Sequence, residues 1–285
     1  MDDLTCEIAD LATGRATYLQ AGPPDADEIV LLHGGGFDNA TLSWKLLLPA
    51  LATSYRVTAP NWPGYGGTAP FDRPYTIADI GRWLIDFLDH LGIKRTSLVG
   101  ISMGGGAAIW SAINHPDRVR ALVPVCTYGV TDRAPYHFLS FVLTRLPLNT
   151  IGRHLILSRP NLLRWAVQSI VAQPEKISSD LLKDVKQALS DDDAASSFTN
   201  FQRGETSPFR LQSDFSSELE SVQHPALFIH GNADPLVPVK AAEKAVRRMQ
   251  NAQLEVLNAG HWPVRETPEH FNDIVVRFLA DVHST

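Results

Sequence analysis

The feature that most constrains the fold is an alternation of short apolar runs with longer amphipathic patterns. Residues 28–33 (EIVLLH) and 96–100 (TSLVG) are nearly continuous in apolar side chains, which is typical of strands buried on both faces. Between such runs, apolar residues recur every three or four positions from Ile77 to Leu91, and Gly92 marks the expected helix end. Strand, helix and strand in this order predict a parallel sheet with right-handed crossovers.

The alternation is interrupted once by a long stretch without strand signal. From about 130 to 216, apolar clusters separated by prolines predict helices instead. The sequence therefore predicts an α/β core made of residues 1–129 and 217–285, with a helical cap at 130–216 inserted after the sixth strand. Further strands are expected at 56–59, 119–126, 226–230 and 254–257, and further helices at 241–249 and 268–278.

Composition excludes several classes of protein. A net charge of −6 gives no basic footprint for nucleic acid, and no apolar run reaches the roughly 18 residues of a membrane span. Cys6 and Cys126 lie far apart, so neither a disulfide framework nor a zinc site is indicated. With no signal peptide visible, we expect a cytoplasmic protein that acts on a small molecule without a metal or cofactor. A homodimer is compatible with these features.

A candidate nucleophile occurs where a buried strand meets a helical pattern. Residues 100–104 read Gly-Ile-Ser-Met-Gly, and small and apolar residues at helical spacing follow from Ala107. A serine on such a sharp turn needs glycines two positions away, where side chains would collide with the adjoining strand and helix. A glycine-rich turn without catalysis is the alternative. Because a serine hydroxyl is un-ionised at neutral pH, Ser102 needs a base to accept its proton.

A histidine and an aspartate follow in the chain order that this arrangement requires. Asp234 and His261 each come after a predicted strand; Asp234 is 132 positions after Ser102, and His261 is 27 positions after Asp234. The aspartate would fix the imidazole tautomer and stabilise the imidazolium. The alternatives are a turn aspartate before Pro235 and a surface histidine. Another place for the acid, after the strand ending at Cys126, offers only Asp132.

Two backbone amides are candidates for stabilising an oxyanion. The Met103 amide follows the nucleophile, and residues 33–37 (HGGGF) end the first strong apolar run. Within that loop we favour Gly35 over Gly36. The glycines could instead form a simple turn or bind a phosphate, but the dinucleotide pattern G-x-G-x-x-G is absent here.

Together these motifs resemble the α/β-hydrolase superfamily over essentially the whole chain. The matching segments are HGGG (33–36), PGYG (63–66), GISMG (100–104), HGNADP (230–235) and GHW (260–262). Within it, the chain is similar to the branch of meta-cleavage product (C–C bond) hydrolases, small carboxylesterases, lactonases and cofactor-free haloperoxidases. Trp262 after the histidine fits the C–C hydrolases, whereas Ile101 replaces their usual asparagine, and Arg203 is a candidate for their cap arginine. Hormone-sensitive lipases differ at the elbow, and epoxide hydrolases and dehalogenases use aspartate where this chain has Ser102.

The resemblance and the motifs lead to three functional hypotheses. The first is hydrolysis of an ester or lactone of a small, fairly apolar carboxylic acid. The second is C–C bond hydrolysis of a dienoate or 1,5-diketone by the same three residues, and the third is a small-molecule receptor. Cap aromatics at helical spacing are either packing residues or pocket residues. The residues expected to contact substrate are Gly36, Phe37, Trp262, Phe138, Trp165 and Arg203.

Overall fold

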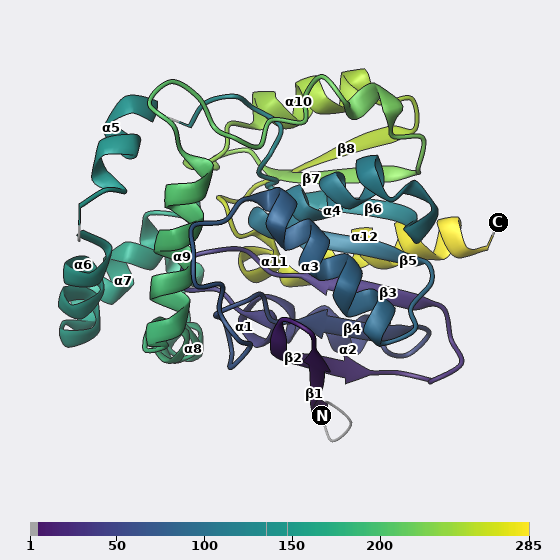
Figure 1. Ribbon diagram of the computed structural model, residues 1–285, viewed down its shortest axis with the longest axis horizontal. Helices are drawn as coiled ribbons and strands as arrows, with labels where there is room; N and C mark the ends of the chain where they lie inside the picture. The colour runs from purple at the N-terminus through teal and green to yellow at the C-terminus, as the bar shows by residue number, and fades with distance from the viewer. Residues whose placement is uncertain (1–4, 135, 147, 285) are drawn as a thin grey trace.

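The centre of the molecule is a single twisted β-sheet. The computed structural model describes residues 5–134, 136–146 and 148–284, and within them the sheet has eight strands in the order β1-β2-β4-β3-β5-β6-β7-β8 (Figure 1). The strands from β4 to β8 in this order are parallel, which confirms the predicted α/β fold, while the β1–β2 hairpin is antiparallel and was not predicted. The strands are β1 (Thr5–Leu11), β2 (Gly14–Ala21), β3 (Glu28–Leu32), β4 (Arg56–Pro60), β5 (Thr96–Ile101), β6 (Val119–Val125), β7 (Ala226–Gly231) and β8 (Ala252–Leu257).

Helices cover both faces of the sheet, because alternate strand residues point to opposite faces. In β3, Val30 joins the core under α3, α4 and α10, whereas Ile29 and Leu31 join the core under α1, α2 and α12. The central strands β4, β3, β5, β6 and β7 are thus buried on both sides, as their continuous apolar runs require. The helices of these two layers are α1 (Ala40–Trp44), α2 (Leu48–Leu51), α3 (Ile77–His90), α4 (Met103–Asn114), α10 (Val239–Arg248), α11 (Pro263–Glu266) and α12 (Pro268–His283).

The predicted helix at 77–91 has the end signals that its sequence contains. Asp79 accepts a hydrogen bond from the Thr76 backbone amide at 2.9 Å, which completes a capping box at the N-terminus of α3. At the other end, Gly92 has φ of +69°, a conformation that L side chains rarely adopt. α3 therefore begins and ends within one residue of the predicted bounds.

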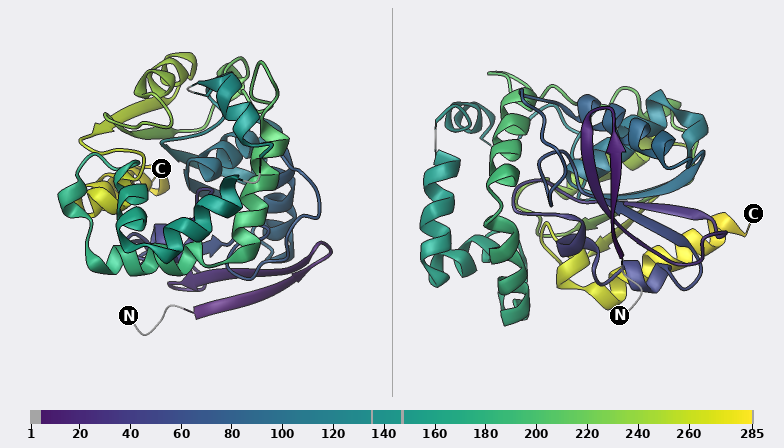
Figure 2. Two further views of the ribbon diagram at one scale, coloured as in Figure 1. Left: turned by 90° about the vertical axis from the view of Figure 1, so that its left-hand side faces the viewer. Right: turned by 60° about the horizontal axis from the view of Figure 1, so that its bottom comes forward.

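Helices fill the stretch in which the strand pattern disappears. They lie between β6 and β7 in the chain and gather at one end of the sheet, at the left of Figure 1 and of the right-hand view of Figure 2, and they face the viewer in its left-hand view. We refer to them as the inserted helices: α5 (His137–Leu143), α6 (Leu148–Ser158), α7 (Pro160–Gln168), α8 (Ser179–Leu189) and α9 (Asp192–Glu205). Short 3₁₀ helices occur at Pro116–Arg118, Pro174–Lys176 and Leu219–Ser221.

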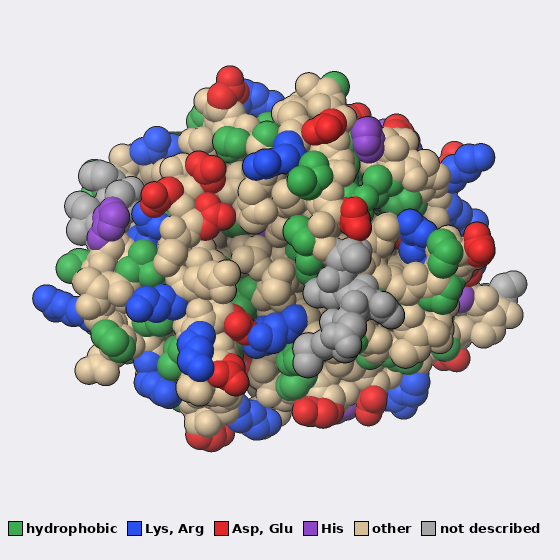
Figure 3. All heavy atoms as spheres, turned by 90° about the horizontal axis from the view of Figure 1, so that it is seen from below, with side chains coloured by type: hydrophobic (Ala, Val, Ile, Leu, Met, Phe, Trp, Pro, Cys, Tyr) green, Lys and Arg blue, Asp and Glu red, His purple; other side chains and the backbone are tan. Residues whose placement is uncertain are grey.

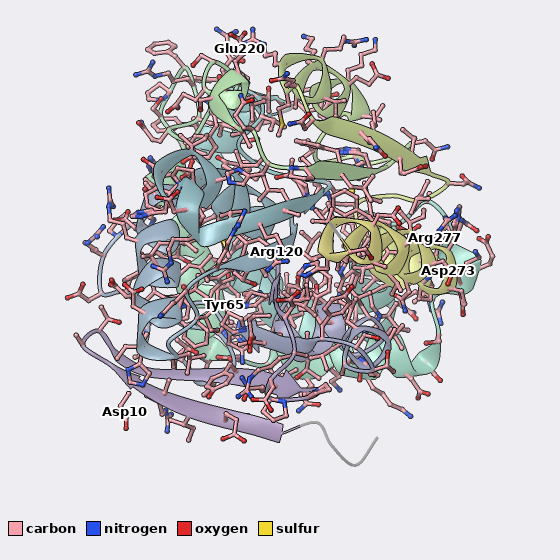
Figure 4. All side chains as sticks on the ribbon, turned by 90° about the vertical axis from the view of Figure 1, so that its right-hand side faces the viewer. Asp10, Tyr65, Arg120, Glu220, Asp273 and Arg277 are labelled. Carbon is pink, nitrogen blue, oxygen red and sulfur yellow. The ribbon has the colours of Figure 1, made fainter. Side chains whose placement is uncertain are left out.

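The surface is polar and carries both signs of charge. On the face seen in Figure 3, acidic and basic side chains are interspersed rather than gathered into one field. Figure 4 shows Asp10 on the edge strand β1, at the outside of the molecule, while Tyr65 lies in the interior, where it is fully buried. Among the described residues no helix combines the length and apolar character that a membrane crossing needs.

Two helical glycines give a matched test of this packing. At Gly204 in α9 a Cβ would collide with the Tyr75 backbone, whereas at Gly152 in α6 no atom lies within 4 Å of the added carbon. Alanine is favoured over glycine in helices by about 1 kcal/mol, but overpacking costs about 1–3 kcal/mol. We expect Gly204→Ala to lower the free energy of unfolding and Gly152→Ala to raise it, measured by urea denaturation. Equal shifts in both variants would contradict this packing of α9.

Candidate active site

Ser102 occupies a strained turn between β5 and α4. Its φ of +51° and ψ of −114° lie outside the regions that L residues favour. The Ser102 amide donates to Val125 O at 2.9 Å, and its carbonyl accepts from the Tyr128 amide at 3.0 Å. At both Gly100 and Gly104 a Cβ would collide with backbone, so neither position admits a side chain without movement. The elbow glycines are therefore a steric requirement of this turn.

Asp234 and His261 are in direct contact, as the sequence order suggested. Asp234 Oδ2 accepts from His261 Nδ1 at 2.8 Å, and the Asp234 side chain is fully shielded from solvent. The other oxygen, Oδ1, accepts from the amides of Leu236 and Val237 at 2.8 and 3.0 Å. Asp234 is thus both the turn residue of the alternative interpretation and the partner of His261. Asp132 is exposed and pairs with Arg133 at 3.7 Å.

The charge state of Asp234 follows from its surroundings. Burial alone would raise its pKa, but hydrogen bonds from His230 and His261 hold the pKa well below its usual range. The carboxylate is therefore ionised throughout the neutral range and accepts a hydrogen bond from His261 Nδ1–H. That leaves the opposite ring nitrogen, Nε2, as the acceptor in a neutral imidazole.

The His261 loop is fixed by a second acid that the sequence analysis did not identify. Glu266 is buried and its Oε1 accepts from the Gly260 amide at 2.8 Å. Its Oε2 accepts from the Ala172 amide at 2.7 Å, and the His261 amide donates to Ile170 O, also at 2.7 Å. The chain after α7 is thereby tied to the histidine loop. Glu266 lies five residues after His261, but an isolated glutamate gives no local signal of such a role.

The glycine loop after β3 is held by a neutral histidine. His33 is fully buried, and burial lowers its pKa to about 3. Its Nδ1–H donates to Gly34 O at 2.7 Å, while Nε2 accepts from the Trp62 amide at 3.0 Å, which requires the Nδ1–H tautomer. The Trp62 indole returns a hydrogen bond to His33 O at 2.7 Å. The end of β4 thus fixes the end of β3.

Asp38 shapes the same loop from its other side. Its Oδ2 accepts from the Gly34 amide at 2.7 Å, and Ser43 donates to both carboxylate oxygens. Burial raises the pKa of Asp38 to about 6, although these donors oppose the shift. At Gly35 a Cβ would lie 2.8 Å from the Phe198 ring, so only glycine fits beneath that ring. Gly35 thereby lines the cavity that is described below.

Ser102 and His261 open on one cavity of about 540 Å³ between the sheet edge and the inserted helices. Gly35, Gly36, Phe37, Met103 and Trp262 line it as well, and the Phe37 and Trp262 rings meet edge to face with centroids 5.8 Å apart. The remaining lining residues include Asp38, Tyr128, Ser140, Thr144, Ile170, Phe198, Phe201, Gln202, Glu205, Thr206, Leu211 and Leu236.

Three residues expected at the substrate lie elsewhere. Phe138 and Trp165 are 63% and 65% exposed and do not line the cavity. Arg203 is also exposed, and its Nε donates to Thr144 O at 3.4 Å. For Arg203 the reason is helical geometry. Residues of α9 three or four positions apart share a face, and the face that meets the cavity carries Phe198, Phe201, Gln202 and Glu205, whereas Arg203 is exposed. The aromatic lining comes instead from Phe198 and Phe201.

One cluster of metal-ligand residue types lies beneath the cavity. Donor atoms of Cys126, His230 and Asp234 are within 4.8 Å of one another. However, His230 Nε2 is 2.8 Å from Val237 O, a carbonyl that can only accept, so this nitrogen carries a proton. Burial, followed by the charge of Asp234, raises the pKa of Cys126 well above its usual range. His230 Nε2 and the Cys126 thiol therefore both carry protons beside Asp234. A protonated nitrogen or thiol cannot act as a metal ligand, so the cluster does not suit a cation.

Comparisons with known proteins agree with this geometry. The family model described as the alpha/beta hydrolase fold matches residues 28–268. A 2-hydroxy-6-oxononadienedioate/2-hydroxy-6-oxononatrienedioate hydrolase of Cupriavidus pinatubonensis is 30% identical over 266 residues, which cover 90% of this chain and 88% of that protein. A 2-hydroxymuconate semialdehyde hydrolase of a Pseudomonas species is 29% identical over 286 residues, covering 95% and 93% of the two chains.

A solved structure extends the likeness to three dimensions. The crystal structure of a serine hydrolase involved in carbazole degradation superposes with a TM-score of 0.79 at 25% identity, over 97% of this chain and 99% of that one. The family match, the sheet order and the strained serine after β5 lead to one conclusion: the chain belongs to the α/β-hydrolase fold family and is an α/β serine hydrolase.

Proposed function

We propose that this protein hydrolyses esters or lactones of small, fairly apolar carboxylic acids through Ser102, His261 and Asp234. The observation that carries the proposal is the 2.8 Å hydrogen bond from His261 to a shielded, ionised Asp234, at the wall of the cavity that Ser102 also borders. An aspartate in this position orients the imidazole and stabilises its protonated form. The mostly apolar lining suits an apolar acyl group.

The proposed reaction proceeds in two steps. Ser102 Oγ attacks the carbonyl carbon while His261 Nε2 accepts the hydroxyl proton, and the amides of Gly35 and Met103 stabilise the oxyanion. His261 then protonates the leaving alcohol oxygen as the C–O bond breaks. In the second step a water attacks the acyl-enzyme with His261 again as base, which frees the acid and restores Ser102. The inserted helices act as a cap that shields this chemistry from bulk water.

Cleavage of a C–C bond is the second candidate, favoured by the names of the relatives. The substrate in the name of the Cupriavidus relative is a dioate and carries two carboxylates. In this chain, Ile101 precedes the nucleophile and no lysine or arginine is among the described residues that line the cavity. Binding a dianion in such a cavity leaves its charges without a partner. These observations favour the neutral ester or lactone.

Labelling with a fluorophosphonate tests the nucleophile. We expect the reagent to modify Ser102 and no other residue, and Ser102→Ala to abolish both labelling and esterase activity. Ser111→Ala is the matched control, because Ser111 is a buried serine of α4 that donates to Ala107 O and does not line the cavity. Peptide mapping of the modified protein makes the measurement. Label that persists in Ser102→Ala would overturn the mechanism.

Replacing Asp234 tests the orientation of the base. An amide can present a donor to His261 Nδ1 and so favours the wrong tautomer, and comparable changes lower kcat by about 10⁴-fold. We therefore expect Asp234→Asn to lower kcat on p-nitrophenyl butyrate by a factor of this order. Asp89→Asn, which removes an exposed carboxylate that pairs with Arg118 and does not line the cavity, should keep kcat within about twofold. Near-normal kcat in Asp234→Asn would count against this assignment.

A substrate panel separates the two candidate reactions. Esters of acetate and butyrate with p-nitrophenol are compared with a 2-hydroxy-6-oxo dienoate in kcat/KM. We expect the esters to be turned over more efficiently, because the described lining residues include no lysine or arginine to pair with the dienoate carboxylate. Rapid dienoate turnover with negligible ester cleavage would reverse the ranking.

A further inference from the structure

Tyr128 is held next to the nucleophile by its backbone and its side chain together. Its amide donates to Ser102 O at 3.0 Å, so the residue cannot move without disturbing the elbow. Tyr128 and Glu205 both line the cavity, and the Tyr128 hydroxyl donates to Glu205 Oε2 at 3.0 Å. The Tyr128 hydroxyl keeps its proton and directs it toward Glu205 as a hydrogen-bond donor, so the lone pairs of the phenol oxygen can accept a hydrogen bond from a ligand.

Glu205, the last residue of α9, is 1% exposed and accepts hydrogen bonds on both oxygens. Oε1 accepts from the Ile77 amide at 2.7 Å and from Ser213 Oγ at 2.6 Å. Oε2 accepts from Tyr128 and from the Ser213 amide at 3.1 Å. Burial raises the pKa of Glu205, while all of these donors favour the ionised form. Each oxygen accepts from one backbone amide and one hydroxyl, so the ionised carboxylate satisfies all four donors at once.

The ionisable side chains along the cavity therefore carry more negative than positive charge. The acids among the described lining residues are Asp38 and Glu205, and none of those residues is a lysine or arginine. Arg145 bonds to the lining residues Thr144 and Thr206 at the rim, but its donors go to Thr144 Oγ1, to Thr206 O and to the carbonyl of Arg203, and its side chain is exposed. A carboxylate in this cavity would meet negative charge without a matching cation.

We propose that Tyr128, held by Glu205, forms an acceptor subsite beside Ser102 that binds an uncharged hydrogen-bond donor of the substrate, such as an amide or hydroxyl group, and disfavours a carboxylate. This inference rests on the proposed ester hydrolysis and deepens it, because it names the polar group that the substrate carries. The acceptor subsite comprises the Tyr128 phenol oxygen, with Glu205 as the residue that positions it.

Matched pairs of esters test the acceptor subsite. On the acyl side, mono-p-nitrophenyl adipate is compared with its terminal amide, p-nitrophenyl adipamate, and with p-nitrophenyl hexanoate as the apolar reference. On the alcohol side, the acetates of 4-hydroxyphenylacetate and 4-hydroxyphenylacetamide form the same pair. The amide and the carboxylate have nearly the same shape and differ in charge and in N–H donors. The measurement is the ratio of kcat/KM for amide to carboxylate, per site titrated with fluorophosphonate.

We expect kcat/KM of the unsubstituted protein to be about tenfold or more higher for the amide than for the carboxylate in at least one series. The amide gains a hydrogen bond to Tyr128 and avoids the repulsion that the carboxylate meets. Tyr128→Phe should reduce this ratio at least threefold, because the acceptor oxygen is removed. Glu205→Gln, which removes the charge but keeps the shape, should also reduce it. Tyr75→Phe is the control: this buried phenol bonds to Ser197 outside the cavity, so the ratio should not change.

Two outcomes would overturn the acceptor subsite. One is an amide preference that is absent in both series although p-nitrophenyl hexanoate is hydrolysed, and the other is a ratio in Tyr128→Phe that equals the ratio in Tyr75→Phe. Both leave ester hydrolysis intact. If no ester is hydrolysed and Ser102 is not labelled, the proposed function fails and the acceptor subsite fails with it. The ester results therefore distinguish the two failures.

Discussion

The backbone hydrogen bonds on either side of Ser102 are the interaction on which the rest of the site depends. A residue with φ of +51° costs about 1–3 kcal/mol, and it persists only where its surroundings over-determine it. Here the Ser102 amide is bonded to Val125 at the end of β6, and the Ser102 carbonyl accepts from Tyr128 just beyond that end. The neighbouring strand thus holds the turn from both sides. The start of α4, the place of Tyr128 and the floor of the cavity all follow from this pairing of β5 with β6.

The parts of the molecule that could be predicted are those whose signal is local. The apolar pattern of each buried strand and of the helix at 77–91 lies within that element, and the glycines beside Ser102 indicate its strained turn. The β1–β2 hairpin escaped prediction because it lies at the edge of the sheet, where Ile8 is 59% exposed and no continuous apolar run is needed. The orientation of Phe138 and Trp165 was likewise undetermined, since helical spacing alone does not say which face meets the cavity.

The buried acids around the cavity could not be recognised from the sequence for a different reason. Glu266 bonds to Ala172, which is 94 positions away, and Glu205 bonds to Ile77, which is 128 positions away. Asp38, Glu266 and Glu205 each accept hydrogen bonds from backbone amides at the ends of elements or in loops. A buried carboxylate is costly unless its oxygens are hydrogen-bonded, so each acid and its loop stabilise each other. In this way one buried acid contributes to fixing each of the glycine loop, the histidine loop and the end of α9.

The inserted helices are attached to the core to very different degrees. α9 is tied by Glu205 and by Ser197, whose hydroxyl donates to Pro63 O at 2.6 Å, whereas α5 leaves Phe138 and Leu139 63% and 56% exposed. Substitutions along the outer face of α5 therefore disturb few contacts, while those at the end of α9 disturb the elbow through Tyr128. Substitutions on the outer face of α5 should therefore change the free energy of unfolding less than substitutions at the end of α9. The cavity thus has one wall, α5, with few contacts to the core and another wall, α9, that is anchored to it.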